Sequence, residues 1–124
     1  MQNYRLAAMA TGLVLAFAPS MASAQTVAEF LETANRIPRN PTAMLHPGFK
    51  RLRDQVSTSF RTIRTEQETR VSRGEARTIC MPDSVPLDAQ ALLNRFNAIP
   101  PARRTMTVNQ AMREWMAERY PCPN

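Results

Sequence analysis

The sequence predicts an all-α fold, namely a small helical bundle with a long central helix and a disulfide-closed C-terminal helical hairpin. Apolar residues recur at helical spacing in four segments, and no segment alternates apolar and polar residues over the length of a strand. Prolines, a glycine and capping residues stand at the borders of these segments. The chain of 124 residues has two cysteines, Cys80 and Cys122, and the second lies close to the C-terminus.

Residues 1–24 have the features of a signal peptide that is cleaved on export. Arg5 precedes an apolar run from Leu6 to Ala18, and the small residues Ala-Ser-Ala follow. We therefore place the cleavage between Ala24 and Gln25. The apolar run is shorter than the roughly 20 residues that span a bilayer, so we expect no stable membrane insertion. Residues 25–124 are expected to form a single all-α domain in the periplasm or outside the cell.

The first half of this domain contains two predicted helices. The first begins after Thr26, whose spacing to Glu29 is that of a capping box, and it ends before Pro38. A short turn is expected at Met44 and Leu45. The second helix begins at Pro47, covers about 26 residues and stops at Gly74. Its apolar residues lie within roughly 100° of arc on a helical wheel: Phe49, Leu52, Val56, Phe60, Ile63 and Val71.

The second half contains a predicted helical hairpin. Asp88 suits the N-cap of a helix that ends before Pro100 and Pro101, which cannot continue it. Thr107 begins the next helix, and Pro121 ends it. From the apolar stripes of all four helices we expect six side chains to be largely buried: Trp115, Leu92, Phe96, Phe30, Phe49 and Leu52.

The two cysteines are predicted to form a disulfide, because exported proteins leave the reducing cytoplasm. A bond between Cys80 and Cys122 would close a loop of roughly 40 residues and stabilise the domain by about 4 kcal/mol in the chain-entropy model. Two thiolates and the single histidine, His46, are too few ligands for a zinc site. A redox-active pair would more often be spaced Cys-x-x-Cys.

The charge of the chain bears on its partners. The formal net charge is +6, and the loss of Arg5 with the signal peptide leaves +5. Export argues against nucleic acid as a partner, so we expect an acidic protein surface, anionic headgroups or cell-wall polymer, or a charge that only keeps the protein soluble. Arg103 and Arg104 form an exposed basic turn between the last two helices and are candidate partner contacts.

The sequence shows no arrangement typical of an enzyme. His46 is the only histidine available to a nucleophile, and it precedes a proline in a predicted turn, where a helix-capping role is the default. The hydroxyl groups between Ser57 and Thr65 have no glycine-rich loop beside them that could bind phosphate. We therefore expect no catalytic residue, no cofactor and no metal.

The C-terminal part resembles the C-terminal half of the type VI secretion amidase immunity proteins, the Rap/Tai family. In that pattern, Cys-x-Pro and a short turn precede a helix that ends near a proline, and a second helix is closed by aromatic-Pro-Cys. About 45 residues are covered, and the matching positions are Cys80, Pro82, Pro100, Tyr120, Pro121 and Cys122. The resemblance implies an exported protein that binds and blocks a cell-wall-degrading effector.

Two functional classes remain open. The first is a binding module that docks on a protein partner in the cell envelope, such as an effector or a cell-wall enzyme. The second is a periplasmic chaperone of the acid-stress type, which is also small, helical and held by one disulfide. With one lysine and one histidine, the chain has only its ten carboxylates to drive a release at low pH, which favours the binding module. The sequence leaves a homodimer open.

Overall fold

The structure is a computed structural model and describes residues 24–123. Over these residues it contains four α-helices, two short 3-10 helices and no strand, which confirms the all-α class. Most of the predicted signal peptide lies outside the described residues. The elements are α1 (Val27–Asn35), η1 (Pro41–Leu45), α2 (Pro47–Ser72), α3 (Ala89–Asn97), η2 (Pro101–Arg103) and α4 (Val108–Arg119).

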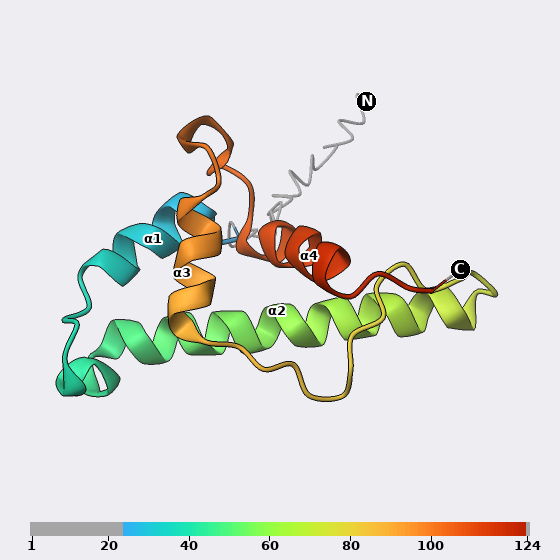
Figure 1. Cartoon of the computed structure of the whole chain (residues 1–124), viewed down its shortest axis with the longest axis horizontal. Helices are drawn as coiled ribbons and strands as arrows, with labels where there is room; N and C mark the ends of the chain where they lie inside the picture. Colours follow the sequence, from blue (N-terminus) through green and yellow to red (C-terminus); the bar gives the residue numbers. More distant parts are fainter. Residues whose placement is uncertain (1–23, 124) are drawn as a thin grey trace, which may run out of the picture.

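Helix α2 is the central element, and the other three helices lie on one side of it (Figure 1). Helix α4 packs along α2, whereas α3 stands across α2 and contacts α1. The two C-terminal helices follow each other as predicted, but α4 packs mainly against α2, whereas α3 packs mainly against α1. The segment between α2 and α3 runs back along α2 before α3 begins (Figure 1).

The predicted capping residues position the helices. Each α-helix begins after a residue in extended conformation whose side chain accepts a hydrogen bond from a backbone N–H of the first turn, as expected for an N-cap. The four N-caps and their donors are Thr26 with Glu29 (3.2 Å), His46 with Gly48 (3.0 Å), Asp88 with Gln90 (3.0 Å) and Thr107 with Gln110 (3.1 Å).

The predicted stop of α2 at Gly74 is also confirmed. Gly74 has a φ of +77°, a conformation that glycine adopts without the steric cost of a Cβ. Its N–H donates to the carbonyl of Val71 (3.0 Å), and the N–H of Glu75 donates to the carbonyl of Arg70 (2.9 Å). This is the Schellman arrangement, in which the last carbonyl groups of a helix are satisfied.

The core lies between α2 and the three helices that cover it. Phe30 of α1 and Phe96 of α3 are fully buried and meet edge to face, with ring centroids 5.1 Å apart. Leu52 and Leu92 are buried as predicted. The remaining members of the buried core are Val27, Leu31, Val56, Ile63, Ile79, Val108, Ala111, Met112 and Met116.

Two predicted core residues are partly exposed, which corrects the expectation that Trp115 and Phe49 are largely buried. In α4 the buried stripe consists of Val108, Ala111, Met112 and Met116, which leaves Trp115 at its flank, packed against the edge of the core. Phe49 lies in the first turn of α2, where the covering helices leave an open groove. Helical periodicity indicates on which face of a helix a side chain lies, but it does not indicate how much of that face the neighbouring helices cover.

The predicted start of the exported chain is bound to the rest of the fold. The carbonyl of Gln25 accepts a hydrogen bond from the N–H of Val108 (2.9 Å), and the N–H of Val27 donates to the carbonyl of Met106 (3.0 Å). These bonds frame an isolated antiparallel bridge between Thr26 and Thr107. The first turn of α1 and the first turn of α4 are therefore held together.

The disulfide between Cys80 and Cys122 is present, with the two Cα atoms 5.0 Å apart. Beside it, the N–H of Cys80 donates to the carbonyl of Tyr120 (2.9 Å), and Ile79 bridges to Pro121. The amide oxygen of the buried Gln67 accepts from the N–H groups of Thr78 (2.8 Å) and Ile79 (3.1 Å). The C-terminal tail is thus joined to the segment that follows α2, and that segment is anchored on α2.

Candidate functional site

The predicted contact residues Arg103 and Arg104 have different environments in the structure. Arg103 is exposed at the end of η2 and makes one ion pair, with Glu114 (3.6 Å). Arg104 is partly buried, and its guanidinium donates to the carbonyls of Ile99 (2.9 Å) and Asn97 (2.9 Å). Arg104 therefore satisfies carbonyl groups at the C-terminal end of α3 and is less exposed than the sequence predicted. The role of the two arginines as partner contacts stays a prediction.

A separate candidate site is an open apolar groove between α1, α2 and α3, with a volume of about 510 Å³. Its floor consists of the buried side chains of Phe30, Leu52, Val56 and Leu92. Its walls are side chains that remain partly exposed: Ala34, Ile37, Phe49, Phe60, Leu87 and Leu93. A groove of this size, lined mainly by apolar and aromatic side chains, is typical of ligand and peptide sites.

The local sequence explains why the groove stays open. Helix α1 ends at Asn35, and the prolines at 38 and 41 keep it from continuing, so the chain turns into η1, which contacts α2. Gly48 then lets α1 approach the first turn of α2, because a Cβ at this position would lie 2.9 Å from Nδ1 of His46 and 3.3 Å from Cγ2 of Thr33. Helix α3 crosses α2 instead of lying along it, so the apolar face of α2 near Phe49 is only partly covered.

The charges at the groove are of one sign. Among the lining residues the only charged ones are Arg39, in the loop after α1, and Arg53 of α2. Arg39 makes no ion pair within the described residues. Arg53 lies 3.7 Å from Asp54, but that carboxylate is bound more closely by Lys50 (2.8 Å). The hydrogen bond from Lys50 also lowers the pKa of Asp54, so Asp54 stays ionised to lower pH.

Two exposed apolar residues follow a residue that lines the groove. Met44 and Leu45 of η1 are 71% and 84% exposed, and their neighbour Ala43 lines the groove. We call these two residues the η1 ledge. Exposed apolar side chains this close in the chain to an apolar groove are candidates for contact with the molecule that the groove binds.

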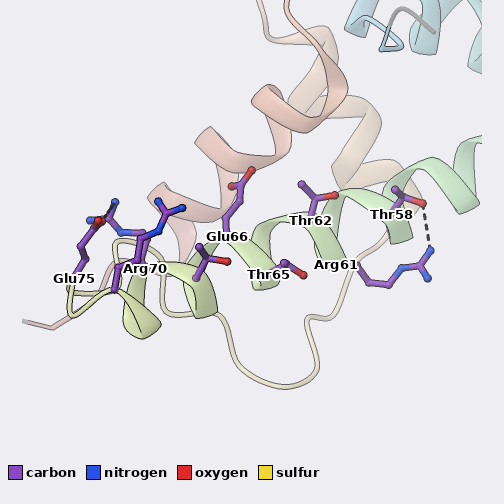
Figure 2. Close-up of a pocket in the computed structure, with 9 residues that line it drawn as sticks. Thr58, Arg61, Thr62, Thr65, Glu66, Arg70 and Glu75 are labelled. Atoms are coloured by element: carbon purple, nitrogen blue, oxygen red, sulfur yellow. Dashed lines mark hydrogen bonds and ion pairs between the residues drawn. The ribbon is translucent and has the colours of Figure 1, made fainter. Parts of the chain in front are cut away.

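A second hollow lies along the exposed side of α2, with a volume of about 620 Å³ (Figure 2). Thr58, Thr62, Thr65 and Thr69 follow one another at helical spacing, between Arg61 at one end and Arg70 and Glu75 at the other. Its charges are of both signs, and three of its five charged residues are in ion pairs. Glu66 binds Arg113 (2.6 Å), and Arg70 binds Glu75 (3.1 Å). This surface offers less to a ligand than the groove does.

A third and smaller hollow, about 300 Å³, lies beside Cys80. Its polar groups already hold the segment after α2. Arg64 donates to the carbonyls of Pro82 (2.8 Å) and Asp83 (3.0 Å), and Gln67 binds Thr78 and Ile79. The hollow is therefore a by-product of this anchoring.

No metal site was found among residues 24–123, where no three His, Cys, Asp or Glu side chains lie close enough together to hold an ion. His46 is occupied as the N-cap of α2, since its Nδ1 accepts from Gly48. A search of the described helices found none that is both long and apolar enough to cross a membrane.

Comparison with known proteins returned no matching family, no matching curated protein and no matching solved structure. Function must therefore be argued from the groove and its charges. Sequence reasoning assigned Phe49 and Phe60 to the core stripe of α2 and missed that they line a groove. The groove could have been anticipated from the two prolines after α1, because they end α1 and so end its cover of α2.

Proposed function

We propose that this chain is an exported periplasmic binding module that captures a protein partner in the apolar groove, in the manner of immunity proteins that block a cell-wall-degrading effector. The observation that carries the proposal is the groove itself, whose walls are apolar and whose charged residues are both arginines. Buried side chains form its floor, and the N-cap of α2 and the close contact at Gly48 fix one end. A pre-formed site loses less entropy on binding than a flexible one.

The proposal assigns no catalytic role, cofactor or nucleic acid to the protein. The disulfide supports a periplasmic or secreted location, because disulfides persist in oxidising compartments. The resemblance of the C-terminal part to the Rap/Tai family supports the immunity-type role. The exposed Arg103 can contribute at the edge of a contact, whereas Arg104 serves the fold.

The test compares two exposed alanines of α3, one inside the groove and one outside it. Ala89 lines the groove, and Ala91 does not. Ala89→Trp fills the groove, so it should abolish capture of the partner by the exported protein from a periplasmic extract, while Ala91→Trp should capture the partner like the wild type. Equal capture by both variants, with thermal unfolding unchanged, would reject the groove as the binding site.

A second candidate function is the acid-stress chaperone, and one observation favours it. The ion pair between Arg95 of α3 and Glu118 of α4 is bidentate (2.7 and 2.9 Å) and depends on an ionised carboxylate. Protonation at low pH would weaken the contact between these two helices and expose apolar surface. The chaperone reading predicts that unrelated proteins are protected from aggregation at low pH and that Ala89→Trp has little effect. The binding-module reading predicts no such protection, and it predicts that Ala89→Trp abolishes capture of the partner.

A further inference from the structure

We infer that the occupant of the apolar groove is a short amphipathic helix of the partner whose apolar face is flanked by acidic residues. This inference rests on the proposed function and adds the chemistry of the partner. Three observations support the inference. The groove is formed by helices and has no sheet edge beside it, its charged residues are both positive, and the apolar η1 ledge follows in the chain.

The surroundings favour a helix over an extended strand. Strand addition needs an exposed sheet edge with free backbone groups, and residues 24–123 form no strand and only two isolated bridges. The groove instead presents apolar side chains from three helices, which is the surface that receives apolar anchors spaced three and four residues apart on a partner helix.

The charges select an acidic partner. Arg39 and Arg53 are the only charged lining residues, both are exposed, and no carboxylate lines the groove. The formal net charge, +6 for the whole chain and +5 after loss of Arg5 with the predicted signal peptide, acts in the same direction. Carboxylates beside the apolar face of a partner helix would meet these arginines, whereas lysines there would be repelled.

The same charges argue against a second copy of this chain as the occupant. A symmetric dimer through the groove would bring the arginines of two copies together, and no carboxylate lines the groove to pair with the arginines of the other copy. The η1 ledge argues against a small amphiphile, because Met44 and Leu45 lie outside the groove and are covered only by an occupant that extends beyond it. Methionine also adapts its shape to different apolar partners.

The experiment measures the binding of two synthetic peptides to the exported, disulfide-bonded protein by fluorescence anisotropy. Both peptides are helical and have the same Leu/Phe face, and the other positions are glutamate in one peptide and lysine in the other. The acidic peptide should bind at least about tenfold more tightly at low salt, which corresponds to about 1.4 kcal/mol, and this preference should shrink as salt is added.

Matched variants locate the effect. The double change Arg39→Glu and Arg53→Glu should remove or reverse the preference. Arg51→Glu is the control, because Arg51 is an exposed arginine of α2 that does not line the groove, and it should retain the preference. Ala89→Trp should weaken both peptides, and Ala91→Trp neither. Equal affinity for the two peptides, or a preference that survives the double change, would overturn the inference.

Two further outcomes would also overturn it. One is tight binding of dodecanoate with no binding of either peptide, which would indicate an amphiphile site. The other is a dimer in sedimentation equilibrium that Ala89→Trp dissociates, which would indicate a second copy.

The experiments distinguish failure of the inference from failure of the proposed function. If Ala89→Trp abolishes capture of the envelope partner and the arginine changes do not, the groove binds a partner that is not acidic. If neither change affects capture, the proposed function fails.

Discussion

At the scale of single residues, neighbouring arginines have opposite roles. Arg103 points away from the core and pairs with Glu114 at 3.6 Å, a separation at which an exposed ion pair contributes little. Arg104 donates two hydrogen bonds to carbonyls at the end of α3, and its own carbonyl accepts from the N–H of Ala28 (3.0 Å). Arg104 therefore joins the end of α3, η2 and the first turn of α1.

This difference predicts a difference in stability. Arg104→Ala removes two charge-assisted hydrogen bonds, so it should lower the free energy of unfolding by about 1–3 kcal/mol. Arg103→Ala should change it by less than about 0.5 kcal/mol, as is usual for surface substitutions. Urea unfolding of the two variants beside the wild type measures both values. A loss of stability that is equal in the two variants would show that the contacts of Arg104 do not hold α3.

At the scale of elements, the sequence predicted the helices well and their arrangement less well. Caps and stops act through the backbone of a few neighbouring residues, so Thr26, Asp88, Thr107 and Gly74 were sufficient to place the helix borders. The disulfide followed from the presence of two cysteines in a chain whose sequence predicts export. These features need no knowledge of distant contacts.

The groove could not be predicted in this way, because it depends on how helices cross. The stripe of α2 predicted that Phe49 faces the core, but not that α1 and α3 leave it partly exposed. Trp115 likewise lies on the flank of α4, since the buried stripe of α4 consists of Val108, Ala111, Met112 and Met116. The role of Arg104 depends on carbonyls that the turn brings to it, which local patterns do not indicate.

Helices α3 and α4 are also joined by an ion pair that should respond to pH. The hydrogen bond from Arg95 lowers the pKa of Glu118 below its ordinary value of 4.5. A carboxyl group whose pKa is lower in the folded state contributes stability above its unfolded pKa and loses it as the pH falls through the folded pKa. The contribution of Glu118 should therefore be complete at neutral pH and disappear below pH 4.5.

Glu118→Gln tests this dependence. The variant should be less stable than the wild type at neutral pH, and the gap should close as the pH falls below 4.5. Urea unfolding at a series of pH values measures the gap. Glu68→Gln is the control, because Glu68 is exposed and makes no ion pair within the described residues. A gap that stays constant with pH would mean that the ion pair does not stabilise the fold.

At the scale of the whole molecule, the two ends of the described chain are both fixed. The segment from Gln25 to Ala28 is hydrogen bonded to the turn before α4 and to the first residue of α4, and Cys122 is bonded to Cys80. The tail and the segment after α2 lie together beyond the end of α4 (Figure 1). Because α4 covers much of α2, holding the tail also holds the largest part of the core in place.

The disulfide should therefore stabilise the whole domain and leave the groove intact. The change of both Cys80 and Cys122 to alanine should lower the free energy of unfolding by about 2–4 kcal/mol, within the range for small secreted domains. Below its unfolding temperature the variant should still bind the partner, since neither cysteine lines the groove. Free thiols in freshly isolated wild-type protein, kept under oxidising conditions, would contradict the structure at this point.

The most direct test of groove-mediated binding is photo-crosslinking in living cells. A photoreactive residue is placed at Leu45, in the η1 ledge, or at Val71, an equally apolar exposed position near the other end of α2. The proposal predicts one dominant protein adduct from position 45, its loss when Ala89→Trp is added, and no such adduct from position 71. The same adducts from both positions, or an adduct at 45 that persists with Ala89→Trp, would contradict binding through the groove.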